Sequence, residues 1–118
     1  MTDITRRDAP MTTSMHQSFL TGKVNGISYR GLLDVRLSDQ EVLVSGPLSG
    51  TIVIPIEAIA AVKQIRNIAE FGIRINYHSP SGVRVVGFRT RRYTAWGDAF
   101  RQLGVTVLPP AGWFADLF

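Results

Sequence analysis

The chain has 118 residues, of which 45% are apolar and 19% are charged, as expected of one globular domain. It has no cysteine, which excludes disulfides, thiolate metal sites and a cysteine nucleophile. The net charge of +4 is unevenly distributed: five basic and six acidic residues precede Lys63, whereas eight basic and two acidic residues lie from Lys63 to Arg101. A basic half of this kind either attracts an anionic partner or is simply a solvated surface.

The N-terminal residues 1–16 are polar and aperiodic, so we expect a disordered tail there and a folded domain over residues 17–108. Alternating apolar residues then predict a series of strands, and Asn25-Gly26 marks a tight hairpin turn. Pro55 lacks an N–H and therefore belongs at an edge, a bulge or a strand end. The segment 59–65 fits a strand or a helix, and we favour a strand because no helix cap precedes it. The expected strands are 18–24, 27–37, 41–45, 51–56, 59–65, 71–78 and 83–89.

One helix follows the last expected strand. Tyr93, Trp96, Phe100 and Leu103 are spaced so that they line one face of a helix. Gly104 follows at a position where helices often end in a left-handed residue. Gly97 lies inside the helix and suits a close approach between helix and sheet. We expect the aromatic face of this helix to close off a rolled sheet.

This order of elements resembles that of the small bacterial pleckstrin-homology-like (PH-like) domains. The resemblance is carried by Ile54–Val62, Gly72–Tyr77, Val85–Thr90 and the aromatic helix, and it covers roughly Phe19 to Val105. It implies a mainly β fold, a seven-stranded antiparallel PH-like barrel capped by one C-terminal helix. The alternatives are another small β-barrel closed by a helix, or a lipocalin-like fragment.

The resemblance also implies a function. PH-like domains are non-catalytic binding platforms for phosphoinositide headgroups, peptides or partner domains. Members that bind headgroups carry a lysine and an Arg-x-Arg pair in the first two strands. Lys23 and Arg30 are the nearest counterparts here, but Gly31-Leu32 follows Arg30 in place of a second arginine.

Four arginines form the candidate anion site: Arg84, Arg89, Arg91 and Arg92. The last two begin the helix, where Thr90 would cap it and leave first-turn N–H groups for an anion. Cations at a helix N-terminus oppose its dipole, so a bound anion would compensate them. The lipid hypothesis is therefore peripheral binding to anionic phospholipid headgroups.

The C-terminal segment 109–118 is unusually apolar for a chain end. Its candidate partner-docking residues are Trp113, Phe114, Leu117 and Phe118. Large apolar side chains of this kind are seldom left wholly in water. We therefore favour a module that binds a protein partner or its own copies, and we place the anionic membrane surface second.

Catalytic and metal-binding patterns are not recognisable. His16 and His78 have no ligand spacing, and no nucleophile elbow or triad order is present, so we expect neither an enzyme nor a cofactor. Nucleic acid is not expected, because the aromatic residues among the arginines belong to the core. Without a signal peptide or a long apolar run, the protein is expected to be cytoplasmic.

Overall fold

The structure is a computed structural model of the chain. It describes residues 13–24, 27–46, 50–68 and 71–110, and for residues 13, 14, 19–24 and 27–32 it describes the backbone only. The elements in chain order are β1 (Thr13–Val24), β2 (Ile27–Ser38), β3 (Glu41–Gly46), β4 (Gly50–Pro55), the 3₁₀ turn η1 (Ile56–Ala58), β5 (Ile59–Arg66), β6 (Phe71–Ser79), β7 (Gly82–Arg89), α2 (Tyr93–Gln102) and β8 (Val107–Leu108).

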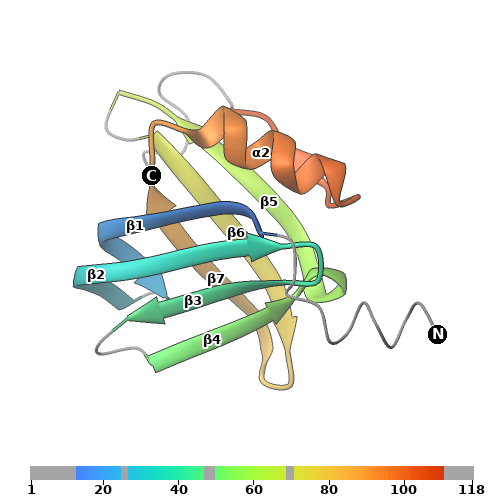
Figure 1. Cartoon of the computed structure of the whole chain (residues 1–118), viewed down its shortest axis with the longest axis horizontal. Helices are drawn as coiled ribbons and strands as arrows, with labels where there is room; N and C mark the ends of the chain where they lie inside the picture. Colours follow the sequence, from blue (N-terminus) through green and yellow to red (C-terminus); the bar gives the residue numbers. More distant parts are fainter. Residues whose placement is uncertain (1–12, 25–26, 47–49, 69–70, 111–118) are drawn as a thin grey trace.

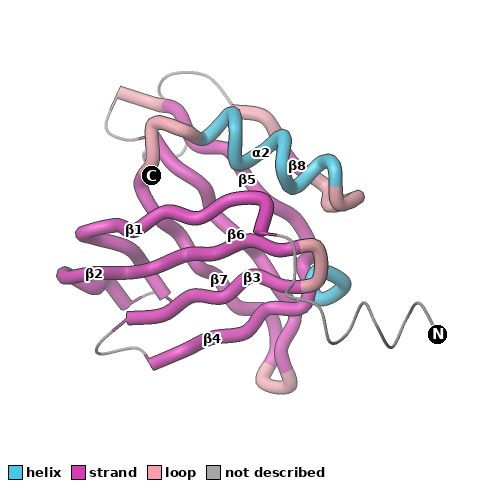
Figure 2. The backbone as a smooth tube through the Cα atoms, in the orientation of Figure 1, coloured by secondary structure: helices cyan, strands magenta, loops and turns pink. Residues whose placement is uncertain are grey.

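The strands form one continuous sheet in the order β4-β3-β2-β1-β7-β6-β5-β8. The long strand β1 belongs to both halves of it, because it pairs with β2 along most of its length and its end, Gly22–Val24, also pairs with β7. A register shift between Phe19 and Thr21 interrupts the β1–β2 ladder, and such irregularities bend a strand. The sheet folds into two layers that cross each other, with β1–β4 in front of β5–β7 in Figure 1 and in the tube view of Figure 2.

The expected seven-stranded antiparallel barrel needs two corrections. The seven strands before the helix are present, but an eighth strand, β8, follows it and runs parallel to β5. The returning chain attaches to β5 through the Val62 N–H, which donates to the Thr106 carbonyl at 2.9 Å. In addition, β4 and β8 end the strand order, so within the described residues the sheet stays open.

The ends of the domain differ from the expected boundaries. Strand β1 begins at Thr13, so residues 13–16, which the sequence places in a tail, belong to the sheet. Within residues 13–16, Met15 packs against the core, so the alternation of inward and outward side chains in β1 already includes this residue. Residues 1–12 and 111–118 lie outside the described residues.

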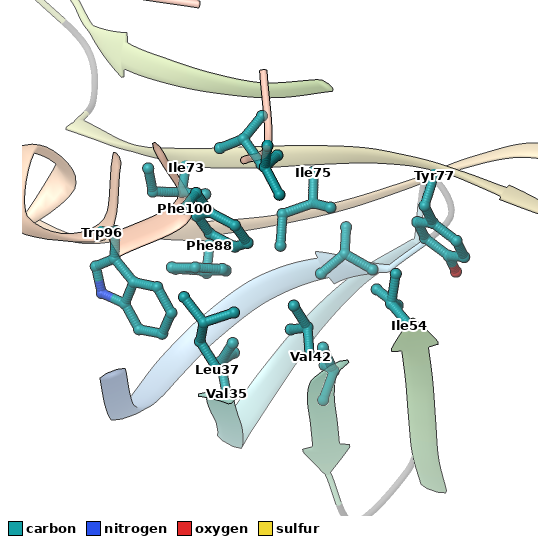
Figure 3. Packing of buried hydrophobic residues seen from close by; sticks show 14 of the residues in the cluster. Val35, Leu37, Val42, Ile54, Ile73, Ile75, Tyr77, Phe88, Trp96 and Phe100 are labelled. Carbon is teal, nitrogen blue, oxygen red and sulfur yellow. The ribbon is translucent and has the colours of Figure 1, made fainter. Parts of the chain in front are cut away.

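The core lies between the two layers and consists of residues from alternate positions of the strands, together with residues of the helix α2 (Figure 3). Its fully buried members are Leu33, Val35, Leu37, Val42, Val44, Ile54, Val62, Ile73, Ile75, Val86, Trp96 and Phe100. Alternation places these side chains inward on each strand, and their neighbours form the outer faces. The predicted strand at 59–65 is confirmed as β5.

The helix α2 closes one end of this core with its aromatic face. Trp96 and Phe100 are wholly buried, and Tyr93 and Leu103 pack against the cluster, which confirms the predicted stripe. The Trp96 ring meets Phe88 edge-on, with ring centroids 5.0 Å apart. The helix ends before Gly104, whose φ of +80° is the left-handed conformation predicted there.

Two glutamines on the sheet hold the helix through hydrogen bonds. Gln17 Oε1 accepts bonds from Trp96 Nε1 (3.0 Å) and from Thr90 Oγ1 (3.1 Å). On the other layer, the buried Gln64 donates from Nε2 to the Tyr93 carbonyl at 2.9 Å. These bonds satisfy polar groups that burial would otherwise leave unpaired. They therefore add to the apolar contacts in fixing the position of the helix.

Candidate functional site

The four candidate arginines do not form one cluster. Arg84 shares its face of β7 with Val86 and Phe88, which are core residues, and it pairs across the sheet with the buried Tyr77. Arg89 lies five residues further along the strand, so alternation places its exposed side chain on the opposite face. A single anion cannot be held by both of these side chains.

Arg91 and Arg92 lie in the turn between β7 and the helix. The Arg91 guanidinium carbon lies 5.8 Å from the centre of the Phe71 ring, and that ring stacks on Tyr93 with centroids 5.9 Å apart. The predicted N-cap, Thr90, is wrong: Arg92 occupies that position without a side-chain cap hydrogen bond. Thr90 Oγ1 instead accepts the Arg92 N–H at 3.0 Å.

A different set of cations shares the outer face of the rear layer. Lys63 on β5 pairs with Arg74 on β6, and Arg74 pairs with Gly87 on β7. Directly paired residues lie on the same face of a sheet, and Arg89 follows two residues after Gly87. Lys63, Arg74 and Arg89 therefore form an outer basic face, with Arg89 exposed and the other two half-buried. The alternation of side chains along β7 could have shown from the sequence that Arg89 and Arg84 lie on opposite faces.

The outer side of β3 and β4 carries an apolar surface that sequence reasoning did not single out. Leu43 and Val53 are paired across these strands, and Pro55 follows at the next outward position of β4. The side chain of Val53 is 52% exposed, Pro55 is exposed and Leu43 is half-buried. We call these three residues the β4 surface. Figure 1 shows β4 at the lower edge of the front layer.

A polar cluster lies on the outer side of β1 and β2. Asp34 Oδ1 is 2.6 Å from His16 Nε2 and accepts a hydrogen bond from Ser18 Oγ at 3.0 Å. Burial raises the pKa of Asp34, but the hydrogen bonds of His16 and Ser18 and the charges of His16 and Arg36 outweigh it, so the pKa is lowered. The cluster stabilises the pairing of these two strands at the surface.

Four of the candidate residues belong to the C-terminal segment. Trp113, Phe114, Leu117 and Phe118 lie outside the described residues. In the part of the chain that the structure describes, no three His, Cys, Asp or Glu side chains are grouped to hold a metal ion. No helix within the same ranges is long and apolar enough to span a membrane.

The architecture is a mainly β fold with one helix, in which an open sheet folds into two layers. Eleven chains of solved structures match the fold. One of them belongs to the "Structure of the Spt16D Pob3N heterodimer", with a TM-score of 0.60 and 13% sequence identity. The match covers 91% of this chain and 61% of that one, so this chain spans about three-fifths of its length. No protein-family model and no curated protein matches the sequence.

Proposed function

We propose that this chain is a non-catalytic binding module that engages a protein partner through the β4 surface. The observation that carries the proposal is the apolar pair formed by the exposed Val53 and the half-buried Leu43, on the end strand β4 and its neighbour β3. Apolar side chains gathered on an outer face are typical of protein contacts, whereas scattered single ones are ordinary.

Two other exposed apolar residues, Val83 and Leu108, lack this grouping. Val83 pairs with His78, and Leu108 pairs with Lys63, so each has a polar neighbour across the sheet. Val53 instead pairs across the sheet with the apolar residue Leu43. Its neighbour two residues along the same strand is Pro55. The β4 surface is therefore distinguished by the direct pairing of two apolar side chains, although Arg36 pairs with Leu43 and Glu41 with Pro55 on the same face.

The structural comparison supports the same class of function. The matching chain comes from the structure of a heterodimer, so a fold of this kind occurs in a complex between two proteins. The proposal for this chain is independent of which proteins those are. It requires only that a partner contacts the side chains of β3 and β4.

Site-specific photo-crosslinking tests the proposal. A photoreactive phenylalanine analogue is placed at Val53 in one sample and at Val83, which is also exposed, in a matched control. After irradiation in cells, we expect a discrete adduct of defined mass with the probe at Val53 and none with the probe at Val83. Equal adducts at both positions, or none at Val53, would contradict a partner surface on β4.

A second candidate function, binding to an anionic phospholipid surface, is favoured by the outer basic face. Sedimentation with phosphatidylserine vesicles at low and moderate salt tests it, because contacts of this kind weaken as salt screens them. We expect Arg74→Gln together with Arg89→Gln to reduce binding, while Arg84→Gln, on the opposite face, leaves it unchanged. Failure of the native protein to sediment with these vesicles would remove the lipid function.

A further inference from the structure

The hydrogen-bond pattern of β4 shows which of its backbone groups face away from β3. The Ile56 N–H donates to the Gln40 carbonyl at 3.0 Å, directly after the pair formed by Pro55 and Glu41. In an antiparallel ladder, hydrogen-bonded and non-hydrogen-bonded pairs alternate. Pro55 is therefore in a non-hydrogen-bonded pair, and so are Val53 and Thr51 at the preceding alternate positions.

The N–H and C=O groups of Thr51 and Val53 consequently point toward the free side of β4. This strand ends the sheet order, so no strand among the described residues pairs with that side. Such an edge is a template for another extended chain, because its donors and acceptors are spaced as in a sheet. Pro55 offers a carbonyl there but no N–H, since its ring nitrogen carries no hydrogen.

The side chains of β4 itself are uncharged on both faces, and the nearest charge on the outer face is Glu41 of β3, which pairs with Pro55. On the inner face, Ile54 is fully buried, whereas Ile52 and Ile56 are only partly buried. On the outer face lies the exposed Val53. A strand added beside β4 would cover Ile52 and Ile56 with alternate side chains and Val53 with the others.

We propose that β4 is a strand-addition site that binds an extended, uncharged segment of a different protein. This inference rests on the proposed function and specifies how the partner is held. Main-chain hydrogen bonds would supply much of the affinity, and alternating apolar side chains would supply the selectivity.

The choice of another protein over a second copy follows from Pro55. If two copies paired through β4 with their Val53 residues opposite each other, each Pro55 would face the Thr51 of the other copy. Each proline lacks the donor needed there, so the paired copies would lose a hydrogen bond at both ends. A segment without proline loses a bond at one end only. Proline on an edge strand is a known protection against such self-pairing.

Selection from a displayed library of linear eight-residue peptides provides the probe. We expect the native protein to enrich peptides with alternating apolar residues, and the bound peptides are then synthesised with a single N-methyl group at each position in turn. Because only alternate N–H groups of an added strand face β4, we expect affinity, measured by titration calorimetry, to fall about tenfold at every second position. Enrichment of no peptide, or losses without this period, would overturn strand addition.

Variants of Val53 separate the backbone contact from the side-chain contact. Val53→Pro removes an N–H that β3 does not use and is expected to weaken the selected peptides about tenfold, whereas Val53→Thr keeps the N–H and is expected to weaken them less. Unchanged binding to a folded Val53→Pro variant would overturn the inference. If that variant fails to fold, the N-methyl series on the native protein still decides.

The outcomes also distinguish this inference from the proposed function. A partner that crosslinks at Val53 but binds the Val53→Pro variant normally would leave the β4 surface as a binding surface and remove strand addition. Light scattering decides between occupants, since the native protein is expected to be monomeric. A dimer that Val53→Pro dissociates would overturn the choice of another protein.

Discussion

Replacing Gly97 with alanine tests whether the helix is held against β5 by Gln64. A Cβ at position 97 would lie 2.2 Å from Gln64 Nε2 and 2.8 Å from Gln64 Cδ, so the glutamine would have to move. That side chain is buried, donates to the Tyr93 carbonyl and accepts from Arg101 at 3.3 Å. Its displacement would leave a buried amide without its present partners.

The expected change in stability is a difference between opposing effects. Alanine favours a helix over glycine by about 1 kcal/mol. Leaving a buried polar group unpaired costs about 1–3 kcal/mol, and overpacking a tight contact costs a further 1–3 kcal/mol or so. We therefore expect Gly97→Ala to lower the free energy of unfolding by about 1–5 kcal/mol, as the costs exceed the gain in helix propensity.

The assay is urea unfolding followed by circular dichroism, with Gln64→Ala as the matched background. Removing the glutamine side chain removes the atoms that the new Cβ would meet. In that background, Gly97→Ala should raise stability by about 1 kcal/mol, through helix propensity alone. If Gly97→Ala stabilises the native sequence as well, the close contact does not determine this position and the reasoning is refuted.

Three further changes test other contacts. Thr90→Val removes the hydroxyl that joins Gln17 and the Arg92 N–H, and we expect a loss of about 1–3 kcal/mol in urea unfolding; an unchanged midpoint would contradict it. Asp34 has a lowered pKa in the folded state, so its contribution is present above its ordinary pKa and is lost as pH falls through the lowered one. Asp34→Asn should flatten the acid side of the stability curve measured from pH 2 to 6, and an equally steep curve would exclude this contribution. Pro55→Thr restores an edge donor and should raise the mass measured by light scattering at high concentration; a constant mass would argue against protection by proline.

Much of the fold could be predicted because its signals are local. The Asn25-Gly26 turn and the alternation on either side of it predict a hairpin, and Val24 does pair with Ile27. The aromatic stripe of the helix follows from spacing alone, and the same spacing places Trp96 in the core. These features depend on residues a few positions apart, whose geometry the backbone fixes.

Features that depend on distant residues could not be read in this way. Gln17 and Trp96 are 79 residues apart, and only the completed fold brings them within hydrogen-bonding distance. The eighth strand has two residues, too few for a periodic pattern, and it forms because the chain returns beside β5 after the helix. Arg84 and Arg89 could be placed only in part from the sequence. Alternation puts them on opposite faces of β7, whereas their shared positive charge suggests a single anion site.

The position of Pro55 in the sheet could be determined only from the strand order. In the sequence T-I-V-I-P, the proline is compatible with an edge strand, a bulge or a strand end. The local sequence pattern does not distinguish these three positions. The strand order places β4 at the end of the sheet, and the ladder then directs the proline nitrogen to the free side. The edge is thus blocked at Pro55 and open at Val53, two residues away. An edge of this form disfavours pairing between two copies more than pairing with another chain. Two paired copies contain two Pro55 residues, and each of them lacks an N–H donor.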